Sequence, residues 1–230
     1  MAAPRKSLRQ SQPPAASTGL PARDALRKAI LDGLFLPGER LVEATLCEQF
    51  GASRFTVRAA LADLAAEGLV EVRRNKGAHV RKVSFDEAIE ITEVRMVLEG
   101  LVAARAATLV TEDQASELDE IVLLMRRAVT AGEFRRYSDL NQRLHGLIRT
   151  IAGHHTADRL IETMRAQLVR HQYTLSLLPG RPATSLPQHE RIVEAIRAGS
   201  PEEAEKAMRD HIASVIEALR SLEAVGLSHH

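Results

Sequence analysis

Four side chains in the C-terminal part of the chain could together bind a metal ion. Asn141 and His145 are four residues apart in a helical stretch, so they share one helix face. His189 and His211 lie eleven residues before and eleven residues after Ser200, where a tight turn joins two helices. Antiparallel helices that rise equally per residue bring such positions to the same depth. The spacing therefore predicts a set of three imidazoles and one amide oxygen for a divalent ion.

These histidines also admit a simpler interpretation. A buried histidine is more often a hydrogen-bonded core residue than a metal ligand, and an asparagine four residues before it can be a plain hydrogen-bond partner. The equal distance of His189 and His211 from the turn favours the metal site, and the core interpretation stays open.

A metal held in this way should attract an anion. Because imidazoles and amides are neutral, the ion would keep its double charge, and a small carboxylate or sugar acid is the simplest ligand. Arg95 lies in an otherwise apolar helix stripe, where an unpaired guanidinium would be costly, so it is a candidate to bind this effector. An ion pair with Glu99, four residues on, is the alternative. Arg149 continues the face of Asn141 and His145 and is the second candidate.

A second group of side chains could contact DNA. Near residue 54 a helix begins whose inner face is formed by Val57, Leu61 and Leu64. A helix end offers free backbone amides to a phosphate, and arginine can bind a guanine edge with two hydrogen bonds. The residues expected to contact DNA from this helix are Ser53, Arg54, Thr56 and Arg58.

A basic ribbon follows this helix. Leu69–Val72 and Ala78–Val83 should form two strands whose tip lies along the DNA backbone or in the minor groove. Exposed charges are often only a solvated surface, but here the helix-turn-helix spacing, the basic tip and the charge distribution agree. The tip residues expected at DNA are Arg73, Arg74, Asn75, Lys76 and Gly77.

Charge is divided unevenly along the 230 residues. Residues 1–83 hold 14 Lys/Arg and 8 Asp/Glu, a balance of +6, whereas residues 84–230 hold 17 and 22, a balance of −5. Only the first part is therefore expected to meet a polyanion. The single Cys47 fits a reducing cytoplasm, and no apolar run approaches the roughly 20 residues of a membrane span. We expect a cytoplasmic protein with no membrane partner.

The elements that must position these residues are mostly helical. Aromatic residues make up only 3% of the chain, and Ala, Leu, Glu and Arg are abundant, which favours helices packed on helices. Ser84 and Glu87 form a capping box that opens a second domain. The expected parts are a disordered basic tail (1–20), a winged helix-turn-helix domain (21–83), an all-helical domain for effector binding and dimerisation (84–223) and a short tail (224–230).

The helix boundaries follow from caps and breakers. The first domain should contain helices at about 22–33, 43–50 and 54–67. Breaks near 109–111, 131–133, 153–156, 179–186 and 199–200 divide the second domain into about six helices, which predicts an antiparallel bundle.

The stretch PGERLVEATLCEQFGASRFTVRAALADLAAEGLVEVRRNKGAHV resembles the winged-helix domain of GntR-family transcription regulators. This resemblance implies DNA contact by the four helix residues above and by Arg74, Asn75 and Gly77 of the tip. Ala44 stands where some relatives have an arginine that contacts DNA, and Phe55 stands where threonine is common.

The segments NQRLH, HERIVEAI and AMRDHI resemble the FCD ligand-binding domain of FadR-like GntR regulators. In the metal-binding branch of that family an Asp-or-Asn-x₃-His pair and two later histidines hold a divalent ion. The resemblance implies this role for Asn141, His145, His189 and His211. Asp is commoner at the first position, and Asn is a weaker, neutral ligand. Together the two resemblances cover roughly residues 22–222.

The sequence thus predicts a mainly α protein with an N-terminal winged helix-turn-helix and a C-terminal antiparallel all-α bundle. We interpret it as a homodimeric transcription repressor that binds a palindromic double-stranded DNA operator. A divalent metal, zinc first and nickel or manganese as alternatives, would help it to sense a small organic acid. One alternative is a purely structural metal. The other is a metal-dependent hydrolase, but HExxH and GxSxG motifs are absent, so no enzyme is expected.

Overall fold

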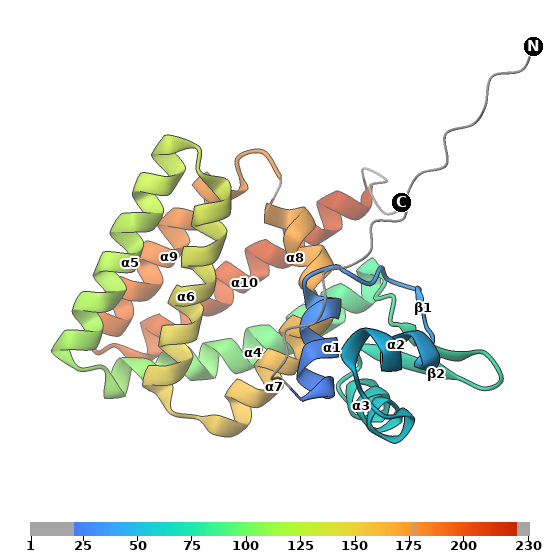
Figure 1. Ribbon diagram of the computed structural model, residues 1–230. Helices are drawn as coiled ribbons and strands as arrows, with labels where there is room; N and C mark the ends of the chain where they lie inside the picture. Colours follow the sequence, from blue (N-terminus) through green and yellow to red (C-terminus); the bar gives the residue numbers. More distant parts are fainter. Residues whose placement is uncertain (1–20, 177, 225–230) are drawn as a thin grey trace, which may run out of the picture. The chain divides into compact units, whose positions relative to one another are not determined.

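The structure is a computed structural model that describes residues 21–176 and 178–224. The tail expected at 1–20 and residues 225–230 of the other expected tail lie outside the described residues. The chain divides into two compact units, Met1–Lys82 and Val83–His230. The first is a small helical unit with a three-stranded sheet and the second is all helical, so the predicted fold class is confirmed (Figure 1).

The N-terminal unit is a winged helix-turn-helix. Gly51, with φ of 61°, ends one helix in the left-handed region, and Ser53 begins the next by accepting a hydrogen bond from the Thr56 amide. Val57, Leu61 and Leu64 are buried on the inner face of that helix, as their spacing predicts. The elements are α1 (Ala22–Leu31), β1 (Arg40–Leu41), α2 (Glu43–Phe50), α3 (Arg54–Ala66), β2 (Val70–Arg73) and β3 (Gly77–Val80).

The sheet of this unit has one strand more than the sequence predicts. Its order is β1-β3-β2, with both pairs antiparallel. Strand β1 has only two residues, which is too short for an alternating pattern, and its pairing with β3 is a long-range contact. The predicted two-strand ribbon is present as β2 and β3.

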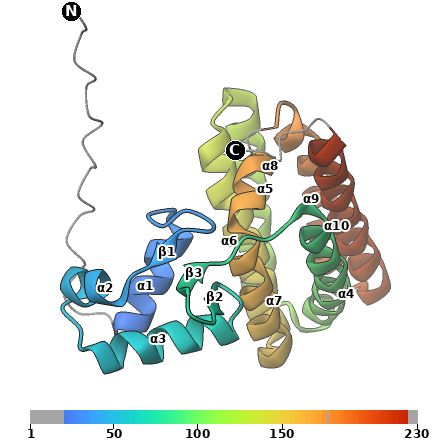
Figure 2. The same ribbon diagram turned by 90° about the vertical axis from the view of Figure 1, so that its right-hand side faces the viewer.

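The C-terminal unit contains seven described helices where the sequence predicts about six. Helix α4 begins at a Ser84 cap and α5 at a Thr111–Gln114 capping box. The additional break falls at Leu168, where no glycine or proline marks it. The helices are α4 (Phe85–Leu109), α5 (Glu112–Ala131), α6 (Phe134–Ala152), α7 (His155–Gln167), α8 (Val169–Ser176), α9 (Arg181–Arg197) and α10 (Pro201–Ala224), which Figure 2 shows from a second side.

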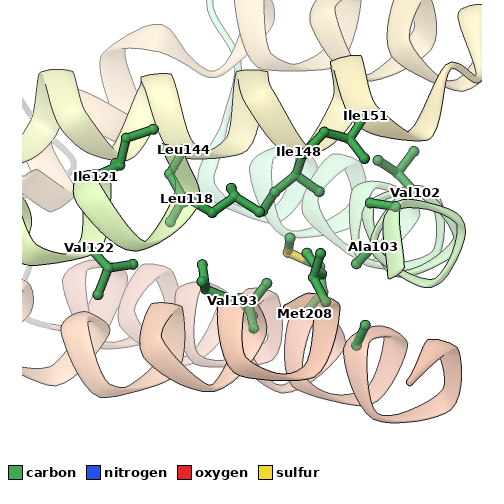
Figure 3. Close-up of a cluster of buried hydrophobic side chains, with 14 of the residues drawn as sticks. Val102, Ala103, Leu118, Ile121, Val122, Leu144, Ile148, Ile151, Val193 and Met208 are labelled. Carbon is green, nitrogen blue, oxygen red and sulfur yellow. The ribbon is translucent and has the colours of Figure 1, made fainter. Parts of the chain in front are cut away.

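The core of this bundle is almost entirely aliphatic. Leu118 and Ile121 of α5, Leu144 and Ile148 of α6 and Val193 of α9 converge in its interior (Figure 3). Each of these side chains is at most 3% exposed. Close packing of this kind holds the helix axes in place, so polar side chains on the same helices have fixed positions. None of the described helices is long and apolar enough to cross a membrane.

Candidate metal centre and nucleic-acid interface

Three histidines from three helices lie together inside the bundle. His145 of α6, His189 of α9 and His211 of α10 are all buried. The ring centroids of His189 and His211 are 4.4 Å apart, and His145 lies 5.5 and 5.4 Å from them. One ring nitrogen from each lies within 4.8 Å of the others. Small side-chain rotations would bring these nitrogens to the roughly 2.0–2.1 Å from one ion that imidazole ligands require.

The turn between α9 and α10 is what brings two of these histidines together. Helix α9 ends at Arg197, Gly199 adopts a φ of 64°, and α10 begins at Pro201. The chain therefore reverses within a few residues, and the two helices pack against each other. Positions equally distant from the turn then face each other, which places His189 beside His211 as the spacing predicts.

Each imidazole uses its Nδ1 atom for a bond to a residue outside the cluster. His145 Nδ1 lies 3.0 Å from Glu99 Oε2, His189 Nδ1 lies 3.1 Å from the Tyr137 hydroxyl, and His211 Nδ1 lies 3.0 Å from Gln188 Oε1. These bonds leave the three Nε2 atoms for the interior of the cluster. Outer bonds of this kind orient metal-binding histidines and select their tautomer.

Two buried polar atoms at this place have no partner in the described structure. His189 Nε2 and Asn141 Oδ1 are both buried and make no hydrogen bond. A buried polar atom without a partner costs free energy and is rare in folded proteins. A bound ion would satisfy both atoms, so the residues present fit a divalent metal.

Burial keeps these imidazoles neutral. It lowers the pKa of His189 and His211 well below the ordinary value, and the neighbouring imidazoles add to this effect. Burial also lowers the pKa of His145, although the bond to Glu99 opposes the shift. A neutral imidazole carries the lone pair that binds a metal, so these three rings are in the protonation state that a metal ligand requires.

Glu99 connects this cluster to Arg95. The Arg95 guanidinium donates to Glu99 Oε1 through Nε at 3.1 Å and through Nη2, and the two side chains are 6% and 3% exposed. Burial by itself would raise the pKa of Glu99, but Arg95 and His145 outweigh it and hold this pKa well below its ordinary value. Arg95 thus makes the intrahelical pair that was its alternative interpretation, and it also lines the cavity described next.

A cavity of about 280 Å³ opens beside the three histidines. Besides Asn141 and Arg95, two arginines that the sequence analysis did not single out line it, Arg165 of α7 and Arg181 of α9. Burial lowers the pKa of both groups. Arg181 donates to the Ser214 carbonyl and hydroxyl, whereas Arg165 has no hydrogen bond or ion pair within the described ranges.

A signal for Arg165 was present in the sequence. It lies four residues after Ile161 and three before Leu168, both buried, so it interrupts an apolar stripe just as Arg95 does. Arg181 begins its helix and interrupts no stripe, so it carried no such signal.

The structure does not bring Arg149 to this cavity. Its guanidinium donates to Asp158 Oδ1 at 2.8 Å and to Glu162 Oε1, and Arg149 is not among the cavity-lining residues. Arg149 lies eight residues after Asn141 on α6, which is a little more than two helical turns. Its side chain therefore no longer shares the helix face of Asn141. The predicted effector-binding role of Arg149 is therefore corrected, because its side chain is paired with two carboxylates away from the cavity.

The predicted DNA-contacting helix residues lie at the start of α3. Ser53 caps this helix, and its hydroxyl lies 2.8 Å from that of Thr56. Arg54 is exposed and has no ion pair among the described residues, while Arg58 Nε donates to Glu43 Oε2 of α2 at 2.7 Å. The side chain of Phe55, between them, is also exposed. This end of α3 therefore presents arginine, hydroxyl and aromatic groups to solvent.

The wing tip has the backbone that its residues predict. Asn75 and Gly77 adopt positive φ values of 61° and 81°, which turn the chain between β2 and β3. Arg74 and Lys76 are exposed and make no ion pair in the part of the chain that the structure describes. Arg73 differs, because its Nη2 donates to Glu71 at 2.9 Å.

Two family profiles match this chain. Residues 20–80 match bacterial regulatory proteins of the gntR family, and residues 90–214 match the FCD domain. The chain is 30% identical to the HTH-type transcriptional repressor RspR of Escherichia coli K12 over 86% of each protein. It is 28% identical to a probable D-xylose utilization operon transcriptional repressor of Paenarthrobacter nicotinovorans over 85% of this chain and 86% of that protein.

Solved structures show the same fold. E. coli McbR/YncC superposes with a TM-score of 0.72 over 88% of this chain and 96% of that chain, at 21% sequence identity. The fold of this chain therefore recurs in that solved structure.

Proposed function

Because the chain belongs to the GntR family of bacterial regulatory proteins, carries an FCD domain and is a DNA-binding transcription regulator, we propose that it is a homodimeric, metal-dependent repressor that responds to a small organic acid. Its N-terminal unit binds a palindromic operator through α3 and the wing. It acts in the cytoplasm, where its DNA target lies. A carboxylate bound in the C-terminal unit changes the affinity for that operator.

One observation carries the proposal for the C-terminal unit. The three buried imidazoles turn their Nδ1 atoms outward to Glu99, Tyr137 and Gln188, and the Nε2 atom of His189 is left buried without a partner. A cluster that served only the core would satisfy its polar atoms from both sides. This one is satisfied only on its outer side, which supports a ligand at its centre.

A divalent ion would be held by His145, His189, His211 and the Asn141 amide oxygen. All four ligands are neutral, and zinc suits three imidazoles and one oxygen, with nickel or manganese as alternatives. The bound ion would supply open coordination positions and two positive charges to the cavity.

The cavity favours a small anion as effector. Arg95, Arg165 and Arg181 line it, and the Glu99 carboxylate beside it is already bound to Arg95 and His145. Arg165 has no acidic partner of its own within ion-pair distance in the described ranges, so a carboxylate would relieve a partly buried charge. A volume of about 280 Å³ suits a small sugar acid or a simple hydroxy acid.

The test combines operator binding, metal content and a panel of small carboxylates. An operator would first be selected in vitro from random DNA with the purified protein. Operator affinity would then be measured by fluorescence anisotropy with each carboxylate, before and after removal of metal by a chelator. At least one carboxylate should change the affinity tenfold or more, about 1.4 kcal/mol, with the metal-loaded protein only.

Variants distinguish this proposal from its alternative. His189→Ala should lose most of the metal by elemental analysis, whereas His155→Ala, an exposed histidine of α7, should keep it. A purely structural metal predicts that the chelator lowers thermal stability and that no carboxylate alters DNA affinity. Purified protein that never takes up a divalent ion would remove the metal from the proposal.

A further inference from the structure

Phe55 is an aromatic side chain that the fold leaves in solvent. It is 83% exposed, the largest exposed fraction of any large apolar side chain in the part of the chain that the structure describes. Its place in the first turn of α3 is fixed, because the Ser53 hydroxyl caps this helix by accepting a hydrogen bond from the Thr56 amide. An exposed phenylalanine on an ordered helix adds nothing to the core, so its whole ring is available to a ligand.

The helical period places Phe55 on the side of α3 that faces away from the core. Successive residues of a helix are about 100° apart around its axis, so Phe55 lies opposite Val57 and Leu64, which are buried. Ala59, about one turn further along, lies on the same side as Phe55 and is also exposed. The outer face of α3 can therefore approach a surface closely at Ala59 while Phe55 projects toward it.

Two arginines next to Phe55 indicate what this surface binds. Arg54 precedes it, is exposed and makes no ion pair within the described ranges. Arg58 follows three residues later, also exposed, and its Nε donates to Glu43 Oε2 at 2.7 Å. A protein partner with an apolar pocket for the ring would also have to cover these positive charges. DNA is complementary to both, because its phosphates attract the guanidinium groups and its grooves admit a helix.

The chemistry of the ring selects one feature of DNA. Base edges in the major groove present hydrogen-bond donors and acceptors, and the C5 methyl group of thymine is the apolar group among them. The Phe55 side chain has no hydrogen-bonding atom, so against polar base atoms it would remove water without replacing its hydrogen bonds. Against a thymine methyl group it would bury apolar surface of both partners.

We propose that Phe55 is a specificity-determining residue of the DNA interface and contacts the C5 methyl group of a thymine in the major groove. The inference rests on the proposed binding of α3 to an operator, and it names one base that α3 distinguishes. Arg54 recognises a base edge by hydrogen bonds, whereas Phe55 recognises a methyl group by contact. In a palindromic operator the same thymine occurs once in each half-site.

Replacement of thymine by uracil tests this contact. Uracil lacks the C5 methyl group and keeps the base pair. Each thymine of the operator selected in vitro would be replaced singly, and the affinity of the full chain would be measured by fluorescence anisotropy. At one thymine in each half-site the unmodified chain should bind about fourfold more weakly, which corresponds to the roughly 0.8 kcal/mol of one buried methyl group.

Variants at Phe55 assign the effect to this side chain. Phe55→Ala should bind the thymine and uracil operators equally, because the methyl group then has no partner. Phe55→Leu, which keeps a large apolar side chain, should retain part of the discrimination. Leu123→Ala removes an exposed apolar side chain of α5 and should keep the full ratio of about fourfold. Circular dichroism should show the same fold in all these proteins, since both positions are exposed.

The outcomes separate this inference from the proposed function. If Phe55→Ala is as sensitive to uracil as the unmodified chain, or if no uracil weakens binding, Phe55 does not read a methyl group. The proposed operator binding then still stands, provided that Arg54→Ala weakens it. If Phe55→Ala loses equal affinity for the operator and for random DNA, the ring contacts the DNA backbone and the inference is wrong. A chain that selects no operator from random DNA would contradict both proposals.

Discussion

His145 Nδ1 and Glu99 Oε2 lie 3.0 Å apart inside the bundle. Glu99 is held ionised by Arg95 as well as by His145, and a carboxylate can only accept hydrogen bonds. The proton of His145 must therefore sit on Nδ1, and the lone pair on Nε2 is left for the cluster. One buried carboxylate thus selects the tautomer of a proposed ligand and neutralises the nearest buried arginine.

Glu99→Gln should weaken both the fold and the metal site. The substitution keeps the shape of the side chain but leaves the Arg95 charge buried without a counter-charge, which costs about 3–5 kcal/mol. Urea unfolding should show this loss, and metal titration should show an affinity about 10- to 100-fold lower.

The control for this variant is an exposed ion pair. Glu117→Gln breaks the exposed pair with Arg143, whose atoms are 2.6 Å apart, and should cost at most about 1 kcal/mol. Equal effects of the two substitutions would contradict the role given to Glu99.

Stability of the metal-free protein should fall with decreasing pH. Burial lowers the pKa of His145, His189 and His211 below 6.5, so below this pH the unfolded chain binds more protons than the folded one. The contribution of each histidine is present above about pH 6.5 and is lost as the pH falls toward the folded-state pKa, by at most about 1.4 kcal/mol per pH unit.

Urea unfolding at about pH 7.5 and about pH 5.5 would measure this slope. His189→Gln should make the slope shallower, while His155→Gln, at an exposed position, should not change it. A slope that is the same in all three proteins would mean that these imidazoles do not titrate with folding.

Asn141→Asp should separate metal affinity from effector affinity. Asn141 Oδ1 is buried without a partner, and a charged carboxylate oxygen at the same place binds a divalent ion more strongly than a neutral amide oxygen. The added negative charge should at the same time weaken an anionic effector. Elemental analysis and calorimetry would record the two changes, and a parallel gain in both affinities would argue against an anion.

Arg54→Ala should reduce specific operator binding while the fold persists. Arg54 is exposed at the start of α3 and has no ion pair within the described ranges, and a two-bond contact to a base is worth about 1–3 kcal/mol. Arg127→Ala, at an exposed arginine of α5, is the control and should bind the operator as the unmodified chain does. Unchanged binding by Arg54→Ala would place another part of the unit in the groove.

The wing should contribute salt-sensitive affinity that does not depend on DNA sequence. Each phosphate neutralised by Arg73, Arg74 or Lys76 changes the slope of log affinity against log salt by about −0.9, so replacing all three should flatten it by up to roughly 3. Arg73 should contribute least, because it must first leave Glu71. Anisotropy titrations at several salt concentrations on random DNA would measure the slope, and an unchanged slope would mean that the wing stays in solvent.

The local elements were predictable because their causes are local. Gly51 and Ser53 mark the turn before α3, Ser84 marks the start of α4, and the apolar positions of α3 repeat with the helical period. These effects act within a few residues along the chain. The extra break at Leu168 escaped prediction because neither glycine nor proline accompanies it there.

Part of the proposed metal set was predictable for the same reason. Asn141 and His145 are one turn apart, and the short turn at Gly199 and Ser200 makes the depths of His189 and His211 a matter of counting residues. Both relationships, the shared face of Asn141 and His145 and the equal depth of His189 and His211, follow from helix geometry alone.

Other features required the tertiary structure. The bonds from His145 to Glu99 and from His189 to Tyr137 join residues 46 and 52 positions apart, and the short β1 pairs with a strand far along the chain. Such contacts depend on how helices rotate and cross, which no local period encodes. The sequence by itself therefore determined which helices carry the histidines and arginines, and only the packing decided that Arg165 lines the cavity and that Arg149 does not.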